Sequence, residues 1–140
     1  VVSFHFGLPS PELLDREKSW GSVVLSTATT IEEGVWLQAN GADVVIAQGV
    51  EAGGHRGMFL TDDASSQLPL AELITGLVAE LSIPVIAAGG IASSADVKAL
   101  LGQGAAAVQV GTSYLLCTEA KTSVLHRAAI KDDSSVNLCS

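Results

Sequence analysis

The stretch IPVIAAGGIASSADVKALLGQGAAAVQVGTSYL, residues 83–115, decides the fold. It opens with an aliphatic run that ends in two glycines, and it closes with a second aliphatic run that also ends near a glycine. Between the runs, Ser93 and Asp96 stand three residues apart before an apolar segment, which is typical of a helix start. The stretch therefore predicts a strand–helix–strand unit whose two strands both end in glycine.

The same alternation extends along the rest of the chain. Five aliphatic runs are each followed by residues with helical signals, such as the T-x-x-E pair formed by Thr30 and Glu33. Alternation of this kind predicts a parallel sheet with right-handed crossovers. The strands are expected within residues 1–7, 22–29, 43–49, 83–90 and 106–115, and helices are expected over 30–40, 69–81, 93–101 and 119–130.

The composition agrees with buried parallel strands. Of the 140 residues, 48% are hydrophobic and only 4% are aromatic, so the apolar content is mostly aliphatic. The formal net charge of −8 argues against nonspecific nucleic-acid binding, which needs cationic side chains. Because no apolar run is long enough to span a bilayer and no signal peptide opens the chain, we expect a cytoplasmic protein without a membrane partner.

Two folds fit this alternation, a doubly wound sheet and a (β/α)8 TIM barrel. No G-x-G-x-x-G follows any predicted strand, which argues against the first. The glycines after the last two strands favour the second, because the loops after strands seven and eight of barrels commonly bind phosphate. We therefore predict an α/β fold with five units of a barrel, equivalent to the fourth to eighth. Since residue 1 falls inside a strand-like run, the chain is expected to be a carboxyl-terminal part of one domain.

The connection after the third strand is exceptional because residues 50–67 form a long loop that contains EAGGHRG, residues 51–57. Long loops inside domains are usually functional, and this one leaves the strand end where α/β proteins place their chemistry. A phosphate is expected nearby, held by backbone N–H groups at Gly89, Gly90, Gly111 and Thr112. Lys98 is the only cationic residue between Pro84 and Lys121, so a neutral site is expected.

Five segments, in this order, resemble the nitronate monooxygenase family. They are SFHFGLP, TATTIEEGVWLQANGADVVIAQGVEAGGHRG, PVIAAGGIAS, VQVGTSYL and VLHRAAI, and together they cover essentially the whole chain. The resemblance implies an FMN-dependent TIM barrel that oxidises alkyl nitronates with O2 to carbonyl compounds and nitrite. It implies His55 as the catalytic histidine, and together with the phosphate hypothesis it predicts a cofactor site at Gln48, Gly53, Gly54, Gly89, Gly90, Gln109, Val110, Gly111 and Thr112.

His55 suits this chemistry because imidazole titrates near neutral pH. It can remove the α-proton of a neutral nitroalkane or, when protonated, hold the nitronate anion. His5 shares a strand face with Ser3, so it is expected to point into the barrel, either as part of the substrate pocket or as a core histidine. No metal site is expected: Asp62 and Asp63 resemble a solvated loop. Cys117 is expected to be a free thiol in the apolar core, and Cys139 a free thiol in the carboxyl-terminal tail.

Two alternatives remain open. The FMN-dependent enoyl-acyl-carrier-protein reductases share much of the same signature, including a similar histidine, and are the alternative enzyme. A non-catalytic partial barrel is the alternative outside enzymes. In either case, five strands without three partners leave sheet edges exposed, and we expect the chain to self-associate.

Overall fold

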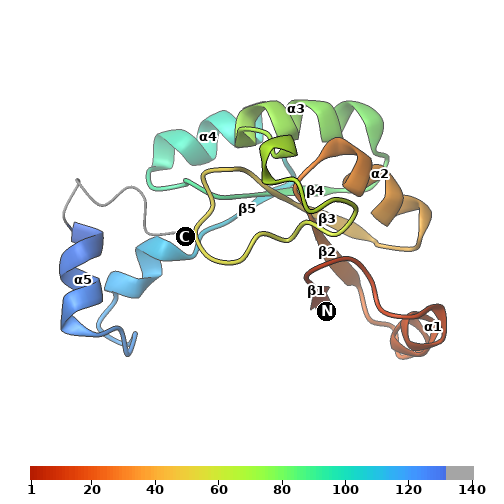
Figure 1. The fold of residues 1–140 in the computed structure, drawn as a ribbon, viewed down its shortest axis with the longest axis horizontal. Helices are drawn as coiled ribbons and strands as arrows, with labels where there is room; N and C mark the ends of the chain where they lie inside the picture. The colour runs from red at the N-terminus through yellow and green to blue at the C-terminus, as the bar shows by residue number, and fades with distance from the viewer. Residues whose placement is uncertain (132–140) are drawn as a thin grey trace. The chain divides into compact units, whose positions relative to one another are not determined.

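All five predicted strands are present and form a single parallel sheet (Figure 1). The structure is a computed structural model, and it describes residues 1–131. The strands follow one another across the sheet in chain order. They are β1 (Val2–Phe4), β2 (Val24–Ala28), β3 (Val44–Gln48), β4 (Val85–Ala88) and β5 (Ala107–Gln109).

This strand order separates the two folds that fit the sequence. A doubly wound sheet reverses its strand order at a switch point, where a crevice opens. Here each strand pairs with the one before it in the chain, as the strands of a (β/α)8 barrel do. The prediction of an α/β fold with five βα units of a TIM barrel is therefore confirmed.

Helices follow the strands as predicted, with two differences near the carboxyl end. The fifth strand stops at Gln109 because a 3-10 helix begins at Thr112, and the last helix starts at Val124 rather than near 119. The Arg127 guanidinium donates hydrogen bonds to the carbonyls of Leu116, Cys117 and Ala120, which hold that segment in turns. The helices are α1 (Pro11–Ser19), α2 (Ile31–Ala39), η1 (Ala64–Ser66), α3 (Leu70–Glu80), α4 (Ser94–Gly102), η2 (Thr112–Leu116) and α5 (Val124–Lys131).

The chain divides into two units. The first, Val1–Gln109, contains the whole sheet and helices α1 to α4, and the second begins at Val110 and contains η2 and α5. Within residues 1–131, no helix is long and apolar enough to cross a membrane. Cys117 is an exposed free thiol, whereas Cys139 lies outside the described residues.

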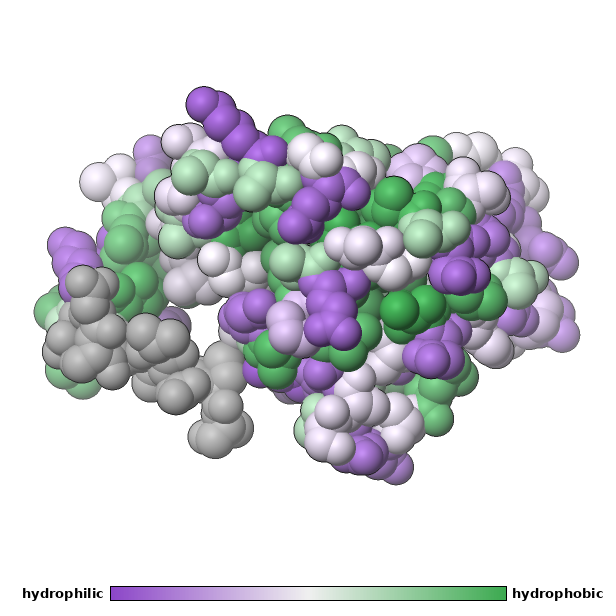
Figure 2. Space-filling view, turned by 90° about the horizontal axis from the view of Figure 1, so that it is seen from above, coloured by the Kyte–Doolittle hydropathy of each residue, from purple (hydrophilic) through white to green (hydrophobic). Residues whose placement is uncertain are grey.

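The two faces of the sheet differ in what covers them. Helices α2, α3 and α4 lie along one face (upper side of the ribbon in Figure 1), and the residues that point toward them are buried. On the other face, Leu25, Val44 and Ile86 are only half-buried, and Ser3 and Ala107 are exposed. Seen from the helical side, hydrophobic residues appear between hydrophilic ones, as expected for a solvated outer layer (Figure 2). The less covered face is the one that would point into a barrel.

Two glycines allow α2 and α3 to pack closely. A Cβ added to Gly34 of α2 would overlap the Leu77 side chain of α3, and one added to Gly76 of α3 would overlap Ile31 of α2. Leu77 is completely buried, so it has little room to move. The close contact fixes α2 against the sheet, which matters for the site because α2 carries Glu33.

The two predicted capping pairs behave differently. Ser93 and Asp96 exchange hydrogen bonds as a complete capping box. Thr30 accepts a hydrogen bond from the Glu33 N–H, but the Glu33 carboxylate bonds the N–H and hydroxyl of Thr29 instead of the N–H of Thr30. Glu33 is thereby turned inward, and its side chain is fully buried.

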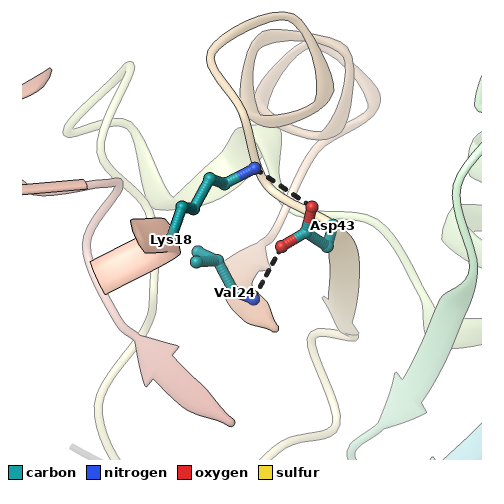
Figure 3. A network of polar contacts seen from close by, with 3 residues as sticks. All are labelled: Lys18, Val24 and Asp43. Atoms are coloured by element: carbon teal, nitrogen blue, oxygen red, sulfur yellow. Dashed lines mark hydrogen bonds and ion pairs between the residues drawn. The ribbon is translucent and has the colours of Figure 1, made fainter. Parts of the chain in front are cut away.

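An ion pair fixes the start of β2. The Asp43 carboxylate accepts one hydrogen bond from the Val24 N–H, at 2.8 Å, and another from the Lys18 ammonium, at 3.0 Å (Figure 3). The Val24 N–H is the main reason that the pKa of Asp43 is lowered, and Lys18 lowers it further. One carboxylate therefore connects α1, β2 and the turn before β3.

Candidate active site

A small cavity opens on the less covered face of the sheet, at the carboxyl ends of its strands. Its volume is about 150 Å³, below the roughly 300–1,000 Å³ usual for pockets that enclose a drug-sized ligand. The described residues therefore form only a partial pocket. Its lining consists of Ser3, Phe4, His5, Thr27, Ile46, Gln48, Ala88 and Gln109.

His5 lines this cavity directly after β1. Its Nε2 lies 3.3 Å from the carbonyl oxygen of His55, and its Nδ1 lies 3.0 Å from the hydroxyl of Thr27. Because a carbonyl can only accept, Nε2 carries the proton of the neutral ring and Nδ1 accepts from Thr27. The predicted orientation of His5 toward the barrel interior is seen here, and the ring holds the loop that carries His55.

Gln48, the last residue of β3, holds the same loop from the neighbouring side of the cavity. Its amide nitrogen donates to the His55 carbonyl at 3.0 Å, and its amide oxygen accepts from the Gly57 N–H at 2.7 Å. The side chain is buried. Both ends of the amide are therefore engaged by the loop, and the His55 carbonyl receives hydrogen bonds from two side chains of the cavity wall.

Gly57 is required by the closeness of the loop to the sheet. A Cβ at this position would lie 2.6 Å from the Thr27 side chain and 2.8 Å from the His5 ring. Only glycine lets the backbone approach this closely. The missing side chain at this position leaves room for the side chains of Thr27 and His5.

Further along the loop, Glu33 holds the backbone from the helical side. One carboxylate oxygen accepts from the N–H groups of Phe59 and Leu60, at 2.6 and 3.2 Å. The other oxygen accepts from the N–H and hydroxyl of Thr29. The Phe59 ring also packs edge-on against Trp36 of α2, with 5.2 Å between ring centroids. The segment after His55 is thus tied to α2 as well as to the strands.

The two ends of the loop are fixed separately. The Gly49 N–H bonds the Ala88 carbonyl of β4, and the Glu51 carboxylate accepts from the Leu70 N–H at the start of α3. A carboxylate at a helix N-terminus also interacts favourably with the helix dipole. The loop is long, yet hydrogen bonds hold it at its ends and in its middle.

The His55 side chain itself is exposed. Its ring meets Phe6 edge-on at 6.5 Å between centroids, and Phe6 in turn lies 4.5 Å from the His5 ring. Phe6 adopts a left-handed backbone conformation, with φ of 67°, which is strained for a residue with a side chain. The strained turn after β1 therefore places an aromatic ring between the two histidines.

The glycines predicted to hold phosphate at the end of β4 have positive φ values, 113° at Gly89 and 64° at Gly90. A Cβ at either position would come within 2.9 Å of the loop, at Ala52 or Glu51. At the start of α4, the Asp96 carboxylate accepts hydrogen bonds from the Ser93 hydroxyl and from the N–H groups of Ala92 and Ser93. The Ser93 hydroxyl is the main reason that the pKa of this carboxyl is lowered, and the two N–H groups lower it further. These glycines thus serve the packing of the loop, and part of the helix N-terminus is occupied.

Other predicted residues remain accessible to a ligand. A Cβ at Gly54 would find no atom within 4 Å, and Gly53 is exposed. Gln109 lines the cavity, and its amide makes no hydrogen bond with another residue of the described chain. In the second unit, Val110 is half-buried and Gly111 and Thr112 are exposed, with open space around Gly111. Sequence reasoning missed Thr27 as a wall residue and Glu33 as a loop contact.

Comparison with known proteins places the chain in one family. The family model described as nitronate monooxygenase matches residues 1–139. A curated nitronate monooxygenase of Pseudomonas aeruginosa is 44% identical over 131 residues, which are 94% of this chain and 37% of that protein. One of Paraburkholderia phytofirmans is 42% identical over 96% of this chain and 37% of its own length. The chain thus spans well under half of these curated relatives.

Solved structures agree. The crystal structure of nitroalkane oxidase from Streptomyces ansochromogenes matches with a TM-score of 0.87 and 42% identity, over 95% of this chain and 39% of that one. The structure of FabK from Thermotoga maritima matches with a TM-score of 0.76 and 30% identity, over 91% and 38%. Because the family model covers nearly all of the sequence, the chain belongs to the nitronate monooxygenase family.

Proposed function

We propose that this chain supplies the loop histidine of an FMN-dependent oxidoreductase, which oxidises alkyl nitronates with O2 to carbonyl compounds and nitrite. The observation that carries this proposal is the fixed position of His55. Its carbonyl is held by Gln48 and His5, two side chains of a cavity at the carboxyl ends of parallel strands. The names of the nitronate and nitroalkane relatives support the substrate class.

The residues of the cavity fit a flavin that lies against the open side of the sheet. A cavity of about 150 Å³ cannot enclose an isoalloxazine ring, but its open side gives the ring a polar wall. Within residues 1–131, the side-chain amide of Gln109 has no hydrogen-bond partner, so it is available to the edge of the ring. Because the Gln48 amide is engaged at both ends, Gln109 is the better candidate for a direct ring contact. When bound, FMN would supply the redox chemistry.

The protein's own residues would then place His55 and transfer a proton through it. His55 would take the α-proton of a neutral nitroalkane, which yields the nitronate, and protonated His55 would hold that anion. His5 and Gln48 keep the backbone of His55 in place through its carbonyl. Phe6 packs on both histidine rings and limits the positions that the His55 ring can reach.

The chain's five units are proposed to be the fourth to eighth of a full barrel. The chain spans 37% of each of the two curated nitronate monooxygenases, which supports a partial barrel. Residues that complete the cavity and the flavin site would then come from the other units. The activity proposed here is accordingly that of the complete barrel.

The test is to purify the complete protein and record its visible spectrum, and then to measure O2 uptake with a preformed alkyl nitronate. The proposal predicts a flavin spectrum, FMN released on denaturation, and O2 uptake with nitrite formation. A protein without flavin, or with flavin but no nitronate-dependent O2 uptake, would contradict it. Rapid reduction of the flavin by NADH or NADPH, with an enoyl thioester as acceptor, would instead favour the enoyl reductase alternative.

A further inference from the structure

We propose that Glu33 is a positioning residue, which sets the place of the His55 loop through the backbone N–H groups of Phe59 and Leu60. The expected effect of Glu33 on the reaction rate rests on the proposed function, whereas its contacts with the loop do not. Glu33 touches neither the cavity nor His55, and it lies in the first turn of α2 on the helical side of the sheet. It therefore acts on His55 only through the loop.

Glu33 is buried, and its carboxylate is fully engaged in hydrogen bonds. The side chain is fully buried and its carboxylate accepts four hydrogen bonds, two from Thr29 and two from the loop. Burying a carboxylate is costly unless it is hydrogen-bonded, and hydrogen bonds to a charged acceptor are stronger than neutral ones. All four donors belong to Thr29, Phe59 and Leu60, so this carboxylate serves to join α2 and the end of β2 to the loop.

The bond between Glu33 and the loop can affect His55 because the two sites are close along the chain. Gln48 accepts a hydrogen bond from the Gly57 N–H, and Glu33 accepts one from the Phe59 N–H. Two buried side chains from different elements therefore bond backbone positions that are only two residues apart. His55 lies two residues before Gly57, the first of these two positions. A shift of Phe59 away from α2 would reach His55 along the backbone through Gly57, which lies two residues from each of them. Misplacing a reacting group by about 1 Å can cost on the order of 10² in rate.

The experiment compares Glu33→Gln with Asp43→Asn in the complete protein. Both variants neutralise a carboxylate that accepts backbone N–H bonds, but Asp43 bonds Val24 and Lys18 and has no bond to the loop. The first readout is amide hydrogen exchange. In Glu33→Gln the charge is lost and one acceptor oxygen becomes an NH2 donor, so a single neutral oxygen faces four donors. The amides of Phe59 and Leu60 should then exchange about tenfold faster or more.

Leu70 provides an internal reference, because its N–H is held by Glu51 at the other end of the same loop and should keep its protection. Asp43→Asn should leave all three amides unchanged. If Glu33→Gln does not fold, Thr29→Val keeps the carboxylate and removes one of its donors, and it should cause a smaller change in the same direction. Unchanged protection of Phe59 and Leu60 in the folded variant would overturn the inference.

The second readout separates positioning from general structural damage. Glu33→Gln should slow oxidation of a neutral nitroalkane by roughly tenfold to a hundredfold, and that of a preformed nitronate much less, because only the first needs a well-placed base. Equal losses with both substrates, or the same loss in Asp43→Asn, would contradict the inference. Absence of flavin or of any oxidation in the wild type contradicts the proposed function instead, and the exchange result then still decides the role of Glu33.

Discussion

Gln48 and His5 show that residues singled out from the sequence can have hydrogen-bond partners that the sequence does not indicate. The resemblance placed Gln48 against a flavin and strand alternation placed His5 in the pocket, and both do lie at the cavity. Their hydrogen bonds, however, go to the His55 loop. The hydrogen-bond partner of a polar side chain depends on where the backbone of a distant loop lies. Local sequence patterns do not predict the position of that loop. Their predicted contacts with flavin and substrate stay predictions.

Asp43 offers a prediction at the scale of one residue. Its pKa lies below the ordinary value of 3.8, mainly because the Val24 N–H bonds the carboxylate. A depressed pKa in the folded state contributes stability that is present above 3.8 and is lost as the pH falls through the folded value. Since the side chain is 41% exposed, we expect Asp43→Asn to lower the free energy of unfolding by only about 1 kcal/mol at pH 7.

This difference should shrink toward zero as the pH falls through the lowered pKa of Asp43, below which both proteins carry a neutral group at position 43. Urea unfolding of wild type and variant between pH 2.5 and 7 measures it. A constant difference across that range would mean that the substitution acts through packing and not through the charge of the carboxylate.

At the scale of elements, the sequence predicted the strands well because buried parallel strands leave aliphatic runs that need no partner to be recognised. It was less successful where a side chain reaches across the chain. Thr30 and Glu33 match the sequence of a capping box, yet the Glu33 carboxylate accepts hydrogen bonds from Thr29 and from the loop. The end of the last predicted strand and the start of the last helix were misplaced for a similar reason, since Arg127 bonds carbonyls up to 11 residues away.

The contact between α2 and α3 makes a second prediction. Gly34→Ala removes a glycine from a helix, which by propensity alone would stabilise the protein by up to about 1 kcal/mol. The new Cβ would overlap the buried Leu77, and overpacking typically costs about 1–3 kcal/mol. We therefore expect a net loss of roughly 1–2 kcal/mol, measured by thermal or urea unfolding.

Gly102→Ala is the matched control, because it is also a helical glycine but has no atom within 4 Å of the added Cβ. It should be neutral or stabilise by up to about 1 kcal/mol. If the two alanine variants had the same stability, the close packing of α2 on α3 at Gly34 would be refuted.

At the scale of the molecule, the sheet has a covered face and an open one. The strand order could be predicted, because right-handed crossovers between consecutive strands leave few arrangements. The cavity lies on the open face, at the carboxyl ends of the strands. The two edge strands, β1 and β5, each pair with one neighbour. Self-association through these edges and the cytoplasmic location stay predictions.

The whole account depends on one histidine held at the strand ends for proton removal. The most direct measurement is the rate of His55→Asn with a neutral nitroalkane and with the corresponding preformed nitronate, in the complete protein with its flavin content determined. Loss of the base should slow the nitroalkane reaction by roughly 10²–10⁴. The nitronate has already lost its proton, so its rate should fall much less, while the flavin content stays the same. Equal losses for both substrates, or none for either, would contradict the account.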